Sequence, residues 1–176
     1  MHGLIHAQLE EFVEASYGAD AWKTVLREAG LDGKLYLPNA NYADHEAAAI
    51  LSAASKLTDT PADSLLESFG EFLAPTLLAS YRHLIQPSWK TLDLLLHTEE
   101  TIHKVVRLRE SAPQPPRLDF QRVGPNTLTF NYNSPRRMSA LAKGIIKGVA
   151  KHYGERVEIE ENSSTNGRSE MTITIN

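Results

Sequence analysis

Cysteine is absent from this 176-residue chain. Disulfide bonds, iron–sulfur clusters, thiolate-bound zinc and cysteine nucleophiles are therefore excluded, because each of them needs a cysteine sulfur. A chain without disulfides suits a reducing compartment, so we expect a cytoplasmic protein. The net charge is only −4, which provides no overall positive excess for binding a nucleic acid.

Long apolar runs are also missing, and no stretch comes near the roughly 20 apolar residues of a membrane-spanning helix. The opening residues, MHGLIHAQLEEF, lack both the basic flank and the unbroken apolar stretch of a signal peptide. Residues 1–110 carry 9 basic and 16 acidic groups, whereas residues 111–176 carry 9 and 6. This small basic excess suits one local anion, and we expect neither a membrane nor a nucleic acid as partner.

Apolar residues recur at helical spacing in the first part of the chain and alternate as in strands in the second. The first part predicts a loop over 31–42 and helices over 4–17, 20–30, from residue 44, over 60–81 and over 88–109. The second part predicts strands around 118–120 and 128–132, a helix over 135–152 and a final hairpin. This order predicts an α+β fold in one domain, 1–176, with a helical part (about 1–110) and an antiparallel sheet carrying one long helix (about 111–176).

Several element ends can also be predicted from the sequence. Asp44 and Thr60 are expected to cap the helices that follow them. Pro75 lies inside an apolar stripe, so we expect a kink or break there. Ser134 and Pro135 are expected as the N-cap and the first residue of the helix over 135–152.

Seven histidines are present, but none forms an HExxH motif, and a multi-histidine zinc site is poorly supported. His103 is unusual because it lies on a largely apolar predicted helical face, which it shares with Leu92, Leu96, Glu99 and Val106. One interpretation is a core histidine bonded to a carbonyl group. The other is the single protein ligand of a metal whose remaining ligands come from a cofactor, as in haem proteins.

Residues 131–137, NYNSPRR, end a strand pattern with Tyr132, Ser134 and Arg136 at alternate positions. Two hydroxyl groups and a guanidinium beside a helix N-terminus favour a carboxylate or a phosphate. The alternative is a capped helix with a solvated arginine. That alternative gives no role to a strand tyrosine in phase with Ser134 and Arg136.

The motif formed by Tyr132, Ser134 and Arg136 resembles the propionate-binding motif of the haem-nitric oxide/oxygen binding (H-NOX) domains. These are relatives of the haem domain of soluble guanylate cyclase. Further segments agree in order over nearly the whole chain: MHGLI, SYGADAW, ESFGEFLAPTLL, the histidine in HTEETIHKVVR, PPRL and MSALAKGIIKG. The resemblance implies that haem b (iron protoporphyrin IX) lies between the helical part and the sheet.

The resemblance also implies a role for each matching residue. His103 matches the proximal haem ligand, and Pro116 matches the proline that presses on the haem and distorts it. The clamp for the two propionates corresponds to Tyr132, Ser134 and Arg136. The remaining matches are Ile5, which contacts the porphyrin edge, and the residues around the gas, Leu9, Leu73, Leu77 and Leu141.

The four leucines carry no hydrogen-bond donor. Ferrous haem holds O2 tightly when a hydroxyl or similar donor stabilises the bound gas, whereas NO needs no such bond. O2-binding members of the family have a tyrosine where this chain has Leu141. The resemblance therefore implies a sensor that binds NO, and also CO, rather than an oxygen carrier.

Signalling in this family implies that NO breaks the bond between iron and His103, so that the haem flattens and the histidine helix moves. The 176 residues show no kinase, cyclase or methyl-accepting segment, so we expect no enzymatic activity. A separate histidine kinase or diguanylate cyclase is the expected partner. The alternatives are a cofactor-free interaction module, an O2-binding variant, and a haem peroxidase that would use His2 or His6.

Overall fold

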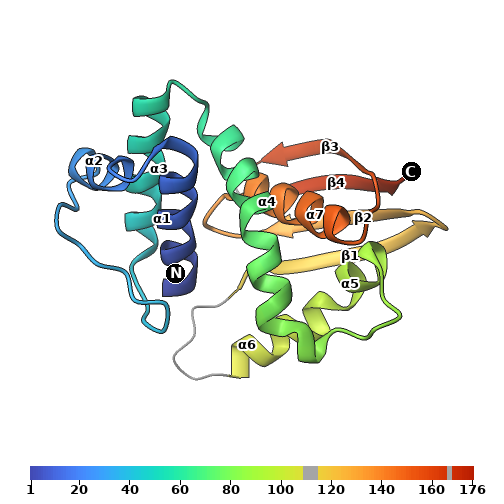
Figure 1. Ribbon diagram of the computed structural model, residues 1–176. Coiled ribbons are helices and arrows are strands. Elements are labelled where there is room, and N and C mark those ends of the chain that lie inside the picture. The colour runs from blue at the N-terminus through green and yellow to red at the C-terminus, as the bar shows by residue number, and fades with distance from the viewer. Residues whose placement is uncertain (109–114, 166–167) are drawn as a thin grey trace.

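The computed structural model describes residues 1–108, 115–165 and 168–176. The helices and helical turns are α1 (Gly3–Tyr17), α2 (Ala21–Glu28), α3 (Asp44–Thr58), α4 (Ala62–Tyr81), η1 (Arg82–Leu84), α5 (Thr91–Thr98), η2 (Glu99–His103), α6 (Lys104–Leu108) and α7 (Ser139–His152). The strands are β1 (Arg117–Gly124), β2 (Thr127–Asn133), β3 (Val157–Thr165) and β4 (Arg168–Ile175). Figure 1 shows α1, α2 and α3 on one side, the strands on the other, and α4 and α7 between them.

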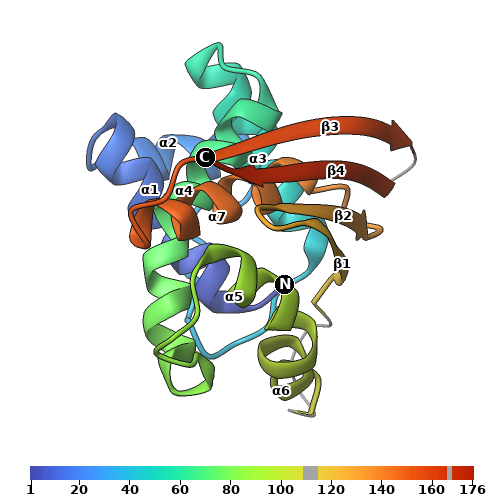
Figure 2. The same cartoon turned by 90° about the vertical axis from the view of Figure 1, so that its right-hand side faces the viewer.

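The four strands form one antiparallel sheet in the order β1-β2-β4-β3. Alternate residues of β2, namely Leu128, Phe130 and Tyr132, are buried, because this face packs together with α7 and α5. Figure 2 shows β3 and β4 extending away from the helices. The predicted α+β fold, a helical part followed by a sheet with one long helix, is confirmed.

The predicted loop over 31–42 runs across the start of α1. The Gly3 amide donates to the carbonyl oxygen of Ala40 at 2.7 Å, and His2 forms an isolated bridge with Asn41. A Cβ atom on Gly3 would lie only 1.9 Å from the carbonyl oxygen of Leu37, so glycine is required at this position. The loop thus fixes the first residues of the chain, some of which line the candidate site.

Two predicted helix caps are wrong. The N-cap of α3 is Ala43, and Asp44 is the first helical residue, with its carboxylate bonded elsewhere in the molecule. The N-cap of α4 is Pro61, while the Thr60 hydroxyl donates to the carbonyl oxygen of Thr58 at 3.2 Å. In both cases the side chain that the local pattern assigned to the cap binds another group instead: Met1 and Arg136 for Asp44, and the Thr58 carbonyl for Thr60.

Helix α4 continues through Pro75, so of the predicted kink or break the break does not occur. Its neighbours Leu73 and Ala74 have no exposed surface, so α4 is packed tightly at this point. Burial of this face outweighs the hydrogen bond that proline removes from the helix.

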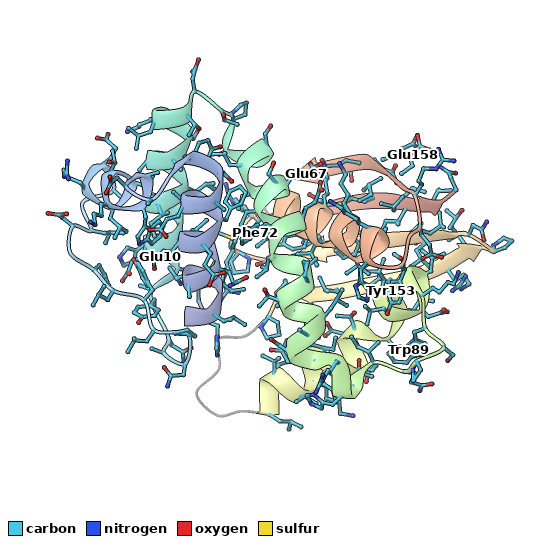
Figure 3. The ribbon with its side chains drawn as sticks, viewed as in Figure 1. Glu10, Glu67, Phe72, Trp89, Tyr153 and Glu158 are labelled. Carbon is cyan, nitrogen blue, oxygen red and sulfur yellow. The ribbon has the colours of Figure 1, made fainter. Side chains whose placement is uncertain are left out.

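Helices α4 and α7 cross at very short range, at Gly70 and Gly144. A Cβ atom on Gly144 would lie 2.0 Å from the carbonyl oxygen of Glu67, and one on Gly70 would lie 2.5 Å from that of Leu141. Figure 3 labels Glu67 on α4 beside this crossing. The contact fixes the helical part against the sheet. Among the helices that the structure describes, none is both long and apolar enough to cross a membrane.

Candidate functional site

A cavity of about 300 Å³ lies where the helical part meets the sheet. Its wall is formed mainly by apolar side chains from α1, α4, α5, α7, β1 and β2. This volume lies at the lower end of the range for small-molecule sites, about 300–1,000 Å³. Nine of the predicted site residues line it: Ile5, Leu73, Leu77, His103, Pro116, Tyr132, Ser134, Arg136 and Leu141.

Leu9 does not line this cavity. It lines a second, apolar cavity of about 30 Å³ that is surrounded by α1, α3 and α4. Ile5 and Leu141 line both cavities, so the two are neighbours. Leu9 is one helical turn beyond Ile5 along α1, and it packs against the core of the helical part instead of the large cavity.

His103 enters the cavity from η2, a single π-helical turn between α5 and α6. The sequence predicted a helix over roughly 88–109, and the structure has consecutive helical residues over 91–108 with this π turn inside them; residue 109 lies outside the described residues. A π turn inserts one extra residue into an α-helix, and such turns are frequent at functional sites. The spacing of apolar residues does not reveal a single inserted residue, so the π turn could not be predicted from it.

The His103 ring is held by Glu99, whose Oε2 lies 3.0 Å from Nδ1. Burial lowers the pKa of His103, and although Glu99 raises it, the net shift is downward, so the imidazole is neutral at pH 7. A carboxylate can only accept, so Nδ1 carries the hydrogen and Nε2 has the free lone pair. A neutral imidazole with a fixed tautomer is the form that binds metal ions.

Glu99 has two further partners. Arg107 forms an ion pair with it at 2.7 Å, and the Leu118 amide donates to its Oε2 at 3.3 Å. Burial alone would raise the pKa of Glu99, but the hydrogen bonds from Arg107, His103 and Leu118 hold it below its ordinary value. Glu99 is therefore an anion beside the cavity, and the sequence predicted no role for it.

Tyr132, Ser134 and Arg136 lie together at another part of the cavity wall. Tyr132 and Ser134 are 4% and 2% exposed, so their hydroxyl groups face the interior. The Ser134 hydroxyl accepts a hydrogen bond from the Arg136 amide at 3.2 Å, which closes a local turn. The three side chains thus combine two hydroxyl groups and a cation, which suits an anionic group.

Arg136 also reaches the helical part of the chain. Its Nε donates to Asp44 at 2.8 Å, and the other carboxylate oxygen of Asp44 lies 2.9 Å from the amino group of Met1. Burial would raise the pKa of Asp44, but the amino group and Arg136 lower it below its ordinary value. The network connects the start of the chain, α3 and the turn after β2.

The helix after this turn begins later than predicted. Helix α7 starts at Ser139, whereas the sequence predicted Ser134 as N-cap and Pro135 as the first helical residue. The reason is local: residues 135–136 form a turn, and Arg137 has φ 54°, a left-handed conformation that cannot belong to an α-helix. The predicted helix N-terminus beside Arg136 is therefore wrong, and the cationic character of this wall comes from the side chain.

The two N-terminal histidines have different surroundings. His2 lines the cavity, and its Nδ1 accepts a hydrogen bond from the Leu4 amide at 3.2 Å. His6 is fully buried outside the cavity and stacks on Tyr36, with ring centroids 4.4 Å apart. Although they are four residues apart, the two do not converge. The described residues contain no group of three or more histidine, aspartate or glutamate side chains arranged to hold a metal ion.

Sequence reasoning also missed two polar residues of the cavity wall, Tyr81 and Thr98. The Thr98 hydroxyl donates to the carbonyl oxygen of Leu94 at 2.7 Å, so it is already engaged within its own helix. Tyr81 ends α4. Its position one turn beyond Leu77 on the same apolar stripe was the signal available in the sequence.

Known proteins share this architecture. The chain has 23% identity to the soluble guanylate cyclase gcy-32 and 24% to gcy-34, both from Caenorhabditis elegans, over 100% and 86% of its length. It spans only about a quarter of the length of these relatives, 26% and 23%. An H-NOX protein from S. oneidensis with Fe(II) superimposes with a TM-score of 0.91 at 23% identity, covering 100% of this chain and 96% of that chain.

The H-NOX protein from K. algicida gives a TM-score of 0.88 at 22% identity, covering 100% of this chain and 97% of that chain. At such identities these similarities show the fold alone. The family model described as Haem-NO-binding matches residues 2–161, which is most of the chain. The chain therefore belongs to the Haem-NO-binding (H-NOX) family of haem-based gas-sensing domains, as its sequence predicted.

Proposed function

We propose that this chain is a sensor of NO that binds haem b in the 300 Å³ cavity. One observation supports this most directly: the His103 imidazole and a cationic, hydroxyl-bearing cluster line the same apolar cavity in a chain of the H-NOX family. We also propose that residues 1–176 act as one domain, because α4 and α7 join the helical part to the sheet.

The residues around the cavity fit haem. The porphyrin supplies four nitrogen ligands, so the protein has to supply only one, and His103 offers a neutral ring with Nε2 as the donor. Tyr132, Ser134 and Arg136 would bind the two propionates, for which hydroxyl and guanidinium groups are suitable partners. The apolar walls suit the porphyrin ring, which Ile5 and Pro116 would contact.

When bound, haem supplies an iron atom with an open position for a diatomic gas. The surrounding side chains then decide which gas is held. Leu73, Leu77 and Leu141 offer no hydrogen-bond donor to O2, whereas NO and CO need none. These residues therefore favour NO over O2 in our proposal.

An O2-binding variant is the second candidate, and the position of Tyr81 favours it. Tyr81 lines the cavity, and its phenol is the type of donor that stabilises O2. A haem peroxidase has less support. His6 is buried outside the cavity and stacks on Tyr36, and His2, which lines the cavity, already accepts a hydrogen bond from the Leu4 amide at Nδ1. The cofactor-free interaction module predicts a protein that takes up no haem at all.

We further propose that NO acts through loss of the bond between His103 and iron, with flattening of the haem and movement of the segment that carries His103. This segment is short: η2 and α6 together span residues 99–108. The signal would pass to a separate protein, such as a histidine kinase or a diguanylate cyclase, and the chain itself would catalyse no reaction. The chain matches only about a quarter of the length of the guanylate cyclase relatives, 26% and 23%. This supports the role of a sensing domain that acts on other parts of a signalling system.

The absorption spectrum of the reduced protein tests the proposal, recorded alone and then with O2, CO and NO. We expect a Soret band that shifts with NO and CO and does not change in air. His103→Ala should lose most of the haem, and Arg136→Ala should bind it more weakly, because a propionate loses its ionic partner. His97→Ala is the matched control, because His97 lies on α5, is exposed and does not line the cavity.

A colourless protein that refuses added hemin would overturn the haem proposal in favour of the interaction module. A stable spectrum of the O2 complex would overturn the selectivity for NO. If Tyr81→Phe then abolished that complex, Tyr81 would be identified as the donor. Turnover with peroxide would instead support the peroxidase.

A further inference from the structure

Glu99 connects three segments through one carboxylate. Its Oε2 accepts from His103 Nδ1 at 3.0 Å and from the Leu118 amide at 3.3 Å, and its Oε1 pairs with Arg107 at 2.7 Å. The side chain is only 24% exposed, so solvent screens these contacts less than it would at the surface. The carboxylate therefore links η2, α6 and β1 in one place.

The contact with His103 determines how that side chain can bind a metal. The hydrogen bond fixes the rotation of the ring and directs Nε2 away from Glu99. A carboxylate on the second nitrogen also makes an imidazole a stronger electron donor to its metal. Glu99 is thus suited to set both the direction and the strength of His103 as a ligand.

The contact with Leu118 reaches the sheet. Leu118 lies opposite Tyr132 in the ladder between β1 and β2, and it follows Pro116 by two residues. Arg107 extends the same connection, because its guanidinium also donates to the carbonyl oxygen of Pro116 at 3.5 Å. A continuous path therefore runs from His103 through Glu99 to both the start of β1 and the strand that carries Tyr132.

The geometry of η2 means that a movement of His103 also moves the Glu99 carboxylate. Glu99 opens the π turn and His103 ends it, and the amide of Lys104 bonds to the carbonyl oxygen of Glu99. A π turn is a rare and local departure from the α-helix. Because one side-chain hydrogen bond joins its two ends, a displacement of His103 acts directly on Glu99 and through it on the Leu118 amide.

We propose that Glu99 is a positioning residue that tunes His103 as a metal ligand and couples movement of His103 to strand β1. This inference rests on the proposed haem site and adds a route by which that site communicates with the sheet. It concerns a residue outside the set that lines the cavity.

Three variants test the proposal. Glu99→Gln keeps the size of the side chain and removes its charge, and Glu99→Ala removes every contact. The matched control is Glu100→Gln, because Glu100 is the next residue of η2, carries the same charge and is exposed. Thermal unfolding of each variant shows whether it is folded.

The first measurement is the frequency of the iron–histidine vibration by resonance Raman spectroscopy, together with the affinity for hemin. In both Glu99 variants the vibration should move to lower frequency, and the affinity should fall about 10–100-fold, as for other partners of metal-bound histidines. Glu100→Gln should match the wild type. An unchanged frequency and affinity in both Glu99 variants would overturn the tuning role.

The second measurement is hydrogen exchange at the Leu118 amide, before and after NO is added. Before NO, exchange should be roughly fivefold faster in Glu99→Ala than in Glu100→Gln, because one hydrogen bond is lost. NO should alter this exchange in the wild type and much less in the Glu99 variants. An equal response to NO in the variants would overturn the coupling.

The exchange rates of the Leu118 amide in Glu99→Ala and Glu100→Gln can be compared before NO is added, and this comparison does not depend on haem. A wild-type protein that took up no haem would refute the proposed function, whereas the Leu118 amide would still report whether Glu99 joins η2 to β1. Equal exchange in Glu99→Ala and Glu100→Gln would then refute that connection.

Discussion

Replacing Gly144 by alanine should destabilise the protein through the crossing of α4 and α7. The new methyl group would lie 2.0 Å from the carbonyl oxygen of Glu67 and 2.9 Å from the Cα atom of Gly70, whereas ordinary contacts begin at 3.4 Å. The clash is with backbone atoms, so rotation of a side chain cannot relieve it. The helices would have to separate by about 1 Å or more to restore normal packing.

The magnitude follows from two opposing effects. Alanine is favoured over glycine inside a helix by about 1 kcal/mol. Overpacking of a tight contact costs about 1–3 kcal/mol, and this clash belongs at the upper end because backbone must move, so the net loss at Gly144 should be about 2 kcal/mol. Because α4 and α7 also carry Leu73 and Leu141, their separation should widen the cavity and weaken haem binding as well.

Urea unfolding measures the loss of stability in Gly144→Ala. An unchanged m-value would show that the denatured state is not affected. Gly154→Ala is the control, because a Cβ atom there meets nothing within 4 Å, although φ is +69°. That substitution should cost about 1 kcal/mol from backbone conformation alone, without changing haem binding. A Gly144→Ala protein as stable as Gly154→Ala would refute the argument from close packing.

Three other substitutions test separate parts of the structure. Burial alone would raise the pKa of Glu46, but its hydrogen bonds with Lys34 and Tyr36 lower it below 4.5. The stability that ionised Glu46 contributes should therefore be lost as the pH falls below that value. In Glu46→Gln, the free energy of unfolding in urea should depend less on pH between about pH 3 and pH 7. Leu141→Tyr adds a phenol to the cavity wall and should give a stable O2 spectrum in air if the apolar wall causes the proposed selectivity for NO. Phe130→Ala should cost about 3–5 kcal/mol in the same unfolding assay, because Phe130 is fully buried, and a loss below 1 kcal/mol would contradict its place in the core.

Several features of the protein could be predicted from sequence alone because they depend on short-range patterns. The change of apolar period from helical to alternating predicted the α+β order, since each period buries one face of its element. The motif of Tyr132, Ser134 and Arg136, together with His103, was enough to predict the family from the sequence. Residue type and spacing along the chain were enough for these predictions.

Other features depend on contacts between distant segments, and only the tertiary structure decided them. Asp44 bonds to the amino group of Met1 and to Arg136, which lies 92 residues away, so a local capping rule could not predict its role. The π turn at His103 leaves no mark on the apolar spacing, and the role of Glu99 appears only when β1 brings Leu118 to its carboxylate. The sequence by itself determined the order of helices and strands and indicated nine of the residues that line the cavity, whereas the packing of α4, α7 and the sheet decided which side chains meet there, because such contacts form only when segments far apart in the chain fold together.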